Sequence, residues 1–419
     1  MRELKRIIYK LMLRMLIFPR WQMKISCTYF YLKNLILSFQ YWMRMPKQKW
    51  SKKAIWIQFL SQTLERNPKN FLSEFKNTLR ICVTYRCNLA CRYCYVKGLE
   101  NKISGDMRLE DFSRLVIWAK DKGWLAMRIL GGEPTIHPRF TEMLEACYRN
   151  RMPVRFSTNN LFSSQIITKL DRFWLPNISI NYVLGILNTE QKVLFKENLK
   201  GLKAHGIYFH FSCIISHQDV DWTEMFEDAK LYRPIYIRAS LSLPGFSQQI
   251  STSEMLDNIK SLSGKIFKMQ EISMRLGIPF FIYRPLLLCM FPREEWQRLR
   301  MTFPFVAFSR CPIGYKGDYG IIVVVNPDLS TFPCTSVFIK GPNIFTFKDR
   351  SQISQFYKES LKQLLSRPLM ESCRECNAHR KFVASLEEGA RPKLSFDEGI
   401  CQGGCLNFKE EAQRLCHVE

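Results

Sequence analysis

The stretch Thr78-Leu-Arg-Ile-Cys-Val-Thr-Tyr-Arg-Cys87-Asn-Leu-Ala-Cys91-Arg-Tyr-Cys94 indicates both the fold and the chemistry of this chain. Its first half is mostly apolar and β-branched, which is typical of a buried strand. Three cysteines then follow at spacings of three and two intervening residues. Three thiolates on one loop can bind one soft metal centre, and an iron–sulfur cluster with only three protein ligands keeps one iron open. The stretch therefore predicts a strand that ends in a catalytic metal site.

The sequence from residue 77 onward alternates between strand and helix patterns. Strands are expected over Thr78–Tyr85, Met127–Leu130, Pro153–Ser157, Ile178–Asn181, Tyr208–Ile215, Ile235–Leu241 and Ile278–Tyr283. Helices are expected over Leu109–Lys120, Arg139–Tyr148, Gln191–His205, Trp222–Leu231 and Glu254–Leu276, with Gly277 closing the last one. Such alternation predicts a parallel sheet with helical crossovers, whose chemistry lies at the carboxyl ends of the strands.

Two further motifs stand at expected strand ends. The turn Gly131-Gly132-Glu133-Pro134 follows the second strand, and its two glycines permit close approach of the backbone to a ligand. The turn Ser157-Thr158-Asn159-Asn160 follows the third strand. Asn160 ends this turn, and asparagine tolerates the left-handed backbone region that glycine often adopts.

These three motifs, in this order, resemble the signature of the radical S-adenosylmethionine superfamily, with Tyr93 in the aromatic position of C-x3-C-x-aromatic-C. The resemblance implies a [4Fe-4S] cluster on Cys87, Cys91 and Cys94, with S-adenosylmethionine on the open iron. It implies cofactor contacts from Tyr93, Gly131, Gly132, Glu133, Ser157, Asn159 and Arg238. It also implies an enzyme that takes an electron from an external donor and cleaves the cofactor to a 5′-deoxyadenosyl radical, which abstracts hydrogen from a substrate.

The region from Arg310 to Glu419 holds seven of the fifteen cysteines in turn-rich sequence. The stretches Asn326-Pro-Asp-Leu-Ser-Thr-Phe-Pro-Cys334 and Cys401-Gln-Gly-Gly-Cys405 resemble elements of the SPASM domain, the auxiliary-cluster extension of many radical S-adenosylmethionine enzymes. The resemblance implies one auxiliary [4Fe-4S] cluster on Cys373, Cys376, Cys401 and Cys416, and another on Cys311, Cys334 and Cys405. Two zinc ribbons built from the same cysteines are the alternative.

Two departures from the SPASM pattern are visible. Leu329 replaces the usual glycine of the first turn, and twenty-four residues separate Cys376 from Cys401. The long insertion is expected to be a surface loop, because lengthening such a loop costs little free energy.

The first sixty residues carry thirteen Lys or Arg against the single acid Glu3, which is nearly half of the net charge of +25. Their basic and apolar residues predict an amphipathic helix. Two interpretations stay open: residues 1–60 contact an anionic membrane surface, or they pack on the enzyme's own core. Lys10 and Arg14 interrupt the first apolar stretch, so no signal peptide is predicted. With no membrane span predicted and an odd number of cysteines, a reducing cytoplasm is the expected compartment.

The expected fold is α/β, a partial (β/α)6 TIM-like barrel with a helical basic N-terminal extension and a small irregular iron–sulfur C-terminal domain. We assign residues 1–76 to the extension, 77–285 to the core barrel, 286–310 to a linker and 311–419 to the SPASM-like domain. The expected substrate is a peptide or protein, and a small or lipid-linked molecule is the alternative within the class. The alternative from another class is a non-catalytic iron–sulfur or zinc protein that binds nucleic acid. It is disfavoured, because the basic residues lie in an apolar amphipathic segment.

Overall fold

The computed structural model describes residues 78–91, 94, 96, 103, 105–175, 177–216, 221–242, 252–278, 280–282, 323–333 and 340–357. Several predictions concern residues outside these ranges and stay predictions. They are the basic extension of residues 1–76, the aromatic position Tyr93, and the seven cysteines Cys311, Cys334, Cys373, Cys376, Cys401, Cys405 and Cys416.

Within the described residues, ten strands form one sheet in the order β10-β9-β8-β1-β2-β3-β4-β5-β6-β7. The first seven along the chain are β1 Thr78–Cys82, β2 Ala126–Leu130, β3 Val154–Thr158, β4 Ile178–Asn181, β5 Phe209–Ser216, β6 Ile237–Ser242 and β7 Phe280–Ile282. Each of these strands pairs in parallel with the next. The predicted parallel sheet is therefore confirmed, strand by strand.

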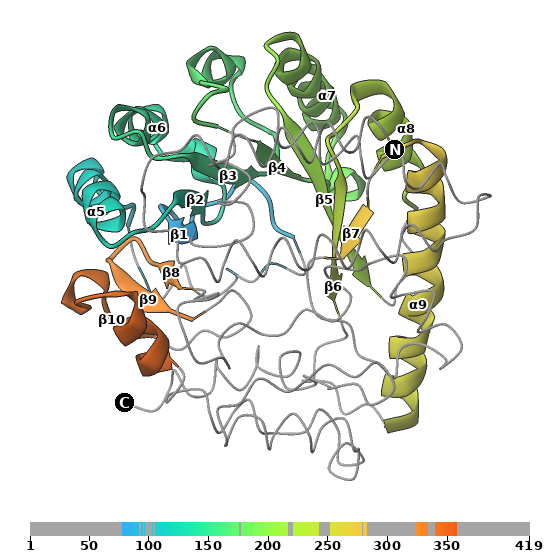
Figure 1. Ribbon diagram of the computed structural model, residues 1–419. Helices are drawn as coiled ribbons and strands as arrows, with labels where there is room; N and C mark the ends of the chain where they lie inside the picture. The colour runs from blue at the N-terminus through green and yellow to red at the C-terminus, as the bar shows by residue number, and fades with distance from the viewer. Residues whose placement is uncertain are drawn as a thin grey trace, which may run out of the picture.

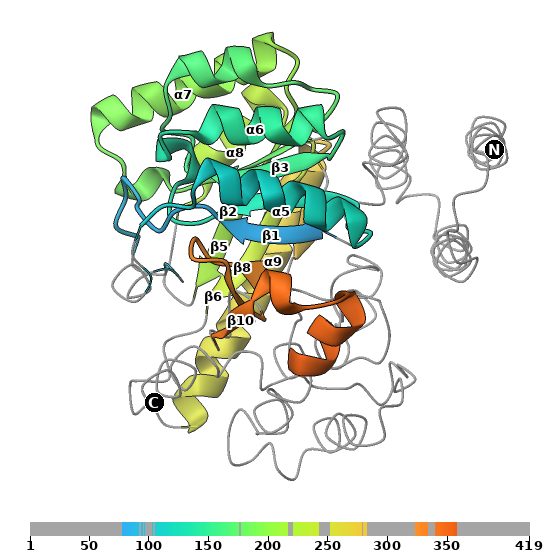
Figure 2. The same ribbon diagram turned by 90° about the vertical axis from the view of Figure 1, so that its left-hand side faces the viewer.

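Five helices connect these strands and cover one face of the curved sheet (Figures 1 and 2). They are α5 Leu109–Asp121, α6 Phe140–Arg149, α7 Thr189–Ala204, α8 Thr223–Tyr232 and α9 Thr252–Arg275. Short 3-10 turns lie at η2 Pro134–Ile136, η3 Ser164–Lys169, η4 Leu184–Ile186 and η7 Ile344–Thr346. Gly277, two residues after the end of α9, has a φ of 70°, which confirms its predicted role in ending that helix.

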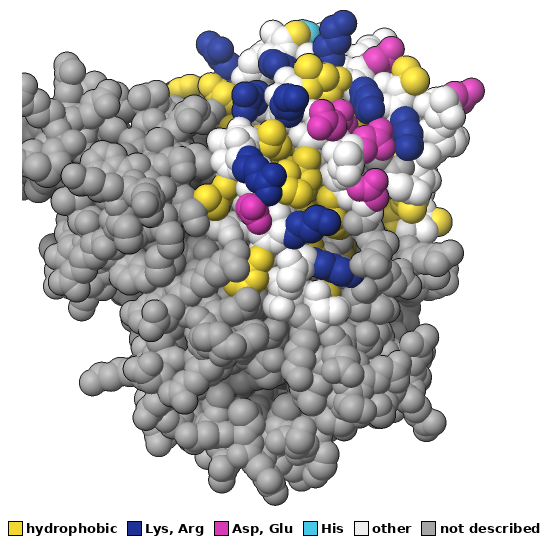
Figure 3. Space-filling model, turned by 90° about the vertical axis from the view of Figure 1, so that its right-hand side faces the viewer, with side chains coloured by type: hydrophobic (Ala, Val, Ile, Leu, Met, Phe, Trp, Pro, Cys, Tyr) yellow, Lys and Arg dark blue, Asp and Glu magenta, His cyan; other side chains and the backbone are white. Residues whose placement is uncertain are grey.

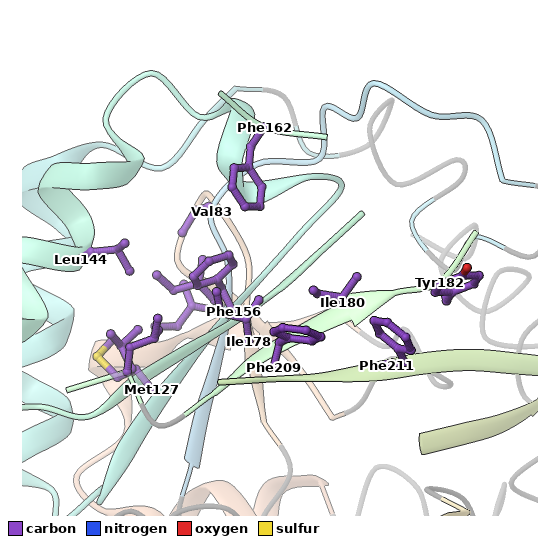
Figure 4. Close-up of a cluster of buried hydrophobic side chains, with 14 of the residues drawn as sticks. Val83, Met127, Leu144, Phe156, Phe162, Ile178, Ile180, Tyr182, Phe209 and Phe211 are labelled. Carbon is purple, nitrogen blue, oxygen red and sulfur yellow. The ribbon is translucent and has the colours of Figure 1, made fainter. Parts of the chain in front are cut away.

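The main core lies between the sheet and the helices (Figure 4). Because side chains alternate along a strand, each strand sends every second residue to this face. Phe156 of β3 is fully buried there and meets Phe140 of α6 edge to face, with ring centroids 5.1 Å apart. Phe209 and Phe211 of β5 continue the same layer, and Tyr182 packs against Phe211. The helices thus hold the strands in position from one side.

Replacing Phe156 by alanine should destabilise the protein by about 3–5 kcal/mol, because a buried ring would leave a cavity between β3 and α6. Urea unfolding measures this loss: the midpoint should fall, while the dependence of the free energy of unfolding on urea concentration should stay unchanged. Phe173→Ala is the matched control, since Phe173 is 55% exposed. Equal losses in the two variants would contradict the burial of Phe156.

The sheet continues beyond the predicted core. The two-residue strand β8, Val324–Val325, pairs in parallel with β1, and β9 Ser330–Phe332 and β10 Gly341–Asn343 follow it antiparallel. Tyr85, three residues after β1, donates a buried hydrogen bond from its hydroxyl to Oδ1 of Asn326. Residues 323–333 are therefore joined to the core at the strand that carries the cysteine loop.

Leu329 lies in the turn between β8 and β9 with a φ of 65°. This left-handed conformation favours glycine, the residue that the SPASM pattern shows at this place. The Leu329 side chain is buried in the main core cluster, and that packing offsets part of the cost of the backbone conformation.

Figure 3 shows the side of the molecule that lies to the right in Figure 1. On the described part of this face, Lys and Arg are mixed with Asp and Glu, and apolar side chains lie between them. In the described part of this face, no patch of a single charge gathers. Among all the residues that the structure describes, no helix combines the length and the apolar character needed to cross a bilayer.

Candidate functional site

Three loops meet at the carboxyl ends of β1, β2 and β3. The amide of Gly132 donates to the carbonyl of Thr84 at 2.9 Å, and the amide of Glu133 donates to the carbonyl of Arg86 at 2.9 Å. A Cβ on Gly131 would lie 2.1 Å from the Thr84 carbonyl oxygen, and one on Gly132 would lie 2.1 Å from that of Arg86. Both glycines are therefore required for the second loop to lie against the backbone that leads into the cysteines.

Glu133 is the buried centre of this arrangement, with 1% of its surface exposed. Its Oε1 accepts from the amide and the hydroxyl of Thr135, at 3.2 and 2.6 Å, and its Oε2 accepts from the amide of Asn159 at 2.6 Å. Burial raises the pKa of Glu133, and the hydrogen bonds from Thr135, Asn159 and Thr158 oppose that rise. The carboxylate thereby connects the loop after β2 to the loop after β3.

Glu133→Gln should lower stability by about 1–3 kcal/mol, because the new amide group must face one of the donors of Thr135 or Asn159. Chemical denaturation measures this loss. Glu142→Gln is the control, since Glu142 forms only an exposed ion pair with Arg139. If both variants unfold at the wild-type midpoint, the buried network around Glu133 does not hold the loops as described.

Asn159 extends the network to the cysteine loop. Its side-chain amide donates to Oδ1 of Asn88 at 2.6 Å, and its own Oδ1 accepts from the amide of Leu161 at 3.0 Å. The amide group of Asn88 in turn donates to the carbonyl of Leu161 at 3.3 Å. Asn88 lies directly after Cys87, so all three loops are connected through side-chain hydrogen bonds.

Asn160 has a φ of 66°, which confirms the predicted left-handed conformation. Its side-chain amide donates to the carbonyl of Phe195 in α7. The buried Asn198, also in α7, donates to the carbonyls of Asn160 and Phe162 at 2.9 and 2.8 Å. Hydrogen bonds with helix α7 therefore hold the loop after β3 in position.

Cys87, Cys91 and Cys94 lie on the loop after β1 and are not joined by disulfide bonds. The amide of Leu89 donates to Sγ of Cys87 at 3.4 Å, and the amide of Cys94 donates to the carbonyl of Cys91 at 3.2 Å. Although Cys87 is solvent-accessible, desolvation by the surrounding protein raises the pKa of its thiol to about 11, and the charges of Glu133, Cys94 and Cys91 add to this rise. The three thiols are thus close enough to interact electrostatically.

The donor set fits an iron–sulfur cluster in its chemistry, because it consists of three thiols on one loop. In the described residues, no three His, Cys, Asp or Glu side chains gather around a point as a single metal ion would require. A cubane cluster binds each cysteine through a different iron, so its ligands need not converge on one point. The assignment of these cysteines as ligands stays a prediction.

Ser157 and Arg238 lie on the face of the sheet away from the helices. The Ser157 hydroxyl accepts from Nη2 of Arg128 at 2.8 Å. Nη2 of Arg238 donates to the hydroxyls of Ser179 and Ser212, at 3.2 and 3.0 Å. The structure thus brings Gly131, Gly132, Glu133 and Asn159 together at the loops, and places Ser157 and Arg238 within the strands beneath. Their contacts with a cofactor stay predictions.

Three further cysteines and one histidine near the site have structural roles. Cys82, Cys147 and Cys213 are buried. The ring of His137 bonds to the carbonyl of Met107 through Nε2 at 3.0 Å and accepts from the amide of Arg139 through Nδ1 at 3.1 Å. The ring therefore has a structural role between two backbone segments.

The sequence interpretation missed Asn88 and Asn198, which tie the loops together. Asn88 lies inside the cysteine motif, whose pattern restricts the cysteines and one aromatic position but not residue 88. Asn198 lies in α7 among the apolar residues Phe195, Leu199 and Leu202, and an amide on the apolar face of a helix was the available signal.

Comparison with known proteins points to one superfamily. Residues 81–182 match the family model described as Radical SAM superfamily. A GTP 3′,8-cyclase of Desulforamulus reducens is 32% identical over 118 residues, which are 27% of this chain and 36% of that protein. The antilisterial bacteriocin subtilosin biosynthesis protein AlbA of Bacillus subtilis is 26% identical over 136 residues, 30% of each chain. The chain therefore spans about a third of the length of these curated relatives.

A solved structure described as native anSMEcpe with bound AdoMet and Kp18Cys peptide has a TM-score of 0.53 at 15% identity. The similarity covers 81% of this chain and 99% of that one. At this identity the likeness shows the fold alone, a mixed α/β fold with a parallel sheet. The matched residues 81–182 contain all three loops of the site.

Proposed function

We propose that this chain is an enzyme that cleaves S-adenosylmethionine reductively and uses the resulting radical to modify a peptide or protein. The observation that carries the proposal is the junction of three loops, in which the cysteine loop, the Gly131–Glu133 turn and Asn159 are joined by hydrogen bonds. The match of residues 81–182 to the radical SAM model covers this junction.

In this proposal Cys87, Cys91 and Cys94 hold a [4Fe-4S] cluster. When bound, the cluster and S-adenosylmethionine together supply an electron and a 5′-deoxyadenosyl group able to abstract hydrogen from a substrate. The protein fixes their positions: Gly131 and Gly132 bring the second loop against the cysteine loop, and Glu133 holds the third. Orientation and exclusion of water are the protein's contribution to such chemistry.

Glu133 also bears on the proposed cofactor contact. Both of its carboxylate oxygens already accept hydrogen bonds from the protein. In the proposal, the backbone of the Gly131–Glu133 turn therefore provides the contact with the cofactor's amino group, and the Glu133 side chain keeps that turn in place.

A peptide or protein substrate is supported by the subtilosin biosynthesis protein and by the solved structure that contains a peptide. A small-molecule substrate is the second candidate, and the similarity to GTP 3′,8-cyclase supports it. Two auxiliary clusters on the C-terminal cysteines, with an external electron donor, complete the proposal.

The test is the formation of 5′-deoxyadenosine by the full chain, reconstituted with iron and sulfide without oxygen and given S-adenosylmethionine and a strong reductant. Product detected by mass spectrometry, together with bound iron, is the expected result. A colourless protein that binds zinc after reconstitution and forms no product would overturn the proposal in favour of a metal-binding protein without this chemistry.

A further inference from the structure

The two ends of the cysteine loop are joined by an ion pair. Arg86 comes directly before Cys87, and Asp106 follows Arg86 by twenty positions, at the far end of the loop. Nε of Arg86 donates to Oδ1 of Asp106 at 3.2 Å, and Nη2 of the same guanidinium donates to Oδ2. Two parallel hydrogen bonds fix the relative orientation of the two groups, which a single contact does not. We name Arg86 and Asp106 the loop-closing pair.

The residue after Asp106 is held through both sides of its backbone. The amide of Met107 donates to the carbonyl of Val83 at 2.8 Å, and Nε2 of His137 bonds to the Met107 carbonyl at 3.0 Å. Met107 is 1% exposed and belongs to the main core. The segment that leaves the cysteine loop is therefore anchored to the residue after β1 and to the loop after β2. Asp106 thus binds Arg86 from a fixed position.

Arg86 carries the backbone against which the loop after β2 lies. Its carbonyl accepts from the amide of Glu133 at 2.9 Å, and a Cβ on Gly132 would lie 2.1 Å from the same oxygen. The amide of Arg86 donates to Oγ1 of Thr84 at 3.1 Å. A rotation of the peptide that follows Arg86 would therefore displace Cys87 and break the contact with Glu133 at the same time.

The surroundings of the pair favour a local role. The side chain of Asp106 is 22% exposed and that of Arg86 is 58% exposed. Burial raises the pKa of Asp106, but the hydrogen bonds from Arg86 and Thr84 outweigh burial and hold that pKa below its usual value. Both members of the pair are therefore charged at neutral pH. Because partly exposed ion pairs contribute little to the stability of a whole fold, the effect of this pair falls on the loop that it closes.

We propose that the loop-closing pair positions the cysteine loop for metal binding by holding its two ends at a fixed separation. With its ends held, the loop has fewer arrangements of the three thiols to lose when a metal centre binds. Arg86 and Asp106 are thus positioning residues, which act through the backbone of Cys87. The identity of the metal centre rests on the proposed function, whereas the closing of the loop does not.

Release of iron from the reconstituted full chain to a chelator, followed through the visible absorbance of the cluster, tests the pair. Arg86→Gln and Asp106→Asn should each release iron roughly 10- to 100-fold faster than wild type, in line with the affinity lost when a metal ligand loses an outer partner. The double variant should release iron at the rate of the single variants, since either change alone removes the same contact. Arg86→Lys keeps the charge without the planar fork and should lie between.

Arg139→Gln is the matched control. Arg139 forms an ion pair with Glu142, and its side chain is 51% exposed, but this pair lies at the start of α6 and does not join the ends of the cysteine loop. The control should release iron like wild type. Urea unfolding of the metal-free variants should give midpoints close to that of wild type, which separates the loss of a local contact from the loss of the fold.

The signs of the two single changes separate positioning from a direct effect of charge. A nearby positive charge favours thiolates and a negative charge disfavours them. A direct effect would therefore make Arg86→Gln release iron faster and Asp106→Asn release it more slowly. Changes of opposite sign would overturn the proposal, as would wild-type rates in both variants. A double variant whose effect is the product of the single effects would also overturn it.

Hydrogen exchange of the metal-free full chain tests the same pair without any metal. The amide of Glu133, which donates to the Arg86 carbonyl, should exchange faster in Arg86→Gln and in Asp106→Asn than in wild type. Unchanged exchange in both variants would count against the loop-closing role. A protein that takes up zinc in place of iron would contradict the proposed function alone, and zinc release to a colorimetric chelator should then follow the same order of rates.

Discussion

Cys94→Ala should lower the formation of 5′-deoxyadenosine at least about 100-fold, since even the loss of an outer partner of a metal ligand commonly costs 10- to 100-fold. The loop after β1 supplies three thiols, and the expected cluster needs all of them to keep a single open iron. Cys94 packs partly against the apolar cluster of Tyr85, Val324 and Phe332, so its removal should affect the fold little. The measurement is anaerobic product analysis together with iron content.

The matched control for this prediction is Cys147→Ala. Cys147 also forms no disulfide bond, but it is fully buried in α6, away from the three loops. The Cys147→Ala variant should retain both iron and activity near the wild-type level. Equal activity in Cys94→Ala and wild type would remove Cys94 from the ligand set.

Gly132→Ala should destabilise the protein by about 2–4 kcal/mol and lower cleavage of S-adenosylmethionine at least about 100-fold. Its Cβ would lie 2.1 Å from the Arg86 carbonyl and 2.6 Å from the Tyr85 carbonyl, and both are backbone atoms that cannot rotate away. The second loop must therefore move, which breaks its two backbone hydrogen bonds to the cysteine loop. Unfolding midpoints and product formation measure the two effects.

Gly264→Ala is the control for Gly132→Ala. A Cβ at Gly264 would meet no atom within 4 Å, and the residue lies within α9. Alanine there should stabilise the protein by about 0.5–1 kcal/mol, because glycine is the poorer helix former, and it should leave cleavage unchanged. If Gly132→Ala behaved like Gly264→Ala, the close approach of the two loops would be refuted.

The sequence was sufficient to predict most of the core. Strands such as Ile178–Asn181 and helices such as Leu109–Asp121 are marked by local apolar patterns. Burial of the same apolar residues stabilises these elements in the folded protein. The left-handed backbone conformation of Asn160 was also predictable, because few residue types other than glycine and asparagine adopt it.

The pairing of β8 with β1 could not be predicted. The strand has only two residues, and its partner lies more than two hundred positions earlier in the chain, so no local pattern marks it. The hydrogen bonds from Asn159 to Asn88 and Glu133 were hidden for a related reason, since they connect three loops that become neighbours only when the sheet forms. Arg128 and Arg155 stand on separate strands of the sequence, and only the register of the folded sheet shows that they are adjacent.

The pairing of β8 with β1 also bears on solubility. Without β8, the strand that precedes the cysteines would present unpaired backbone amides and carbonyls, which can template pairing with other chains. Within the described residues the sheet instead ends at β10, where Pro342 has no amide hydrogen to offer to a further strand. We therefore expect versions shortened to residues 77–285 to aggregate during expression, which makes the full chain the form to use for every test described above.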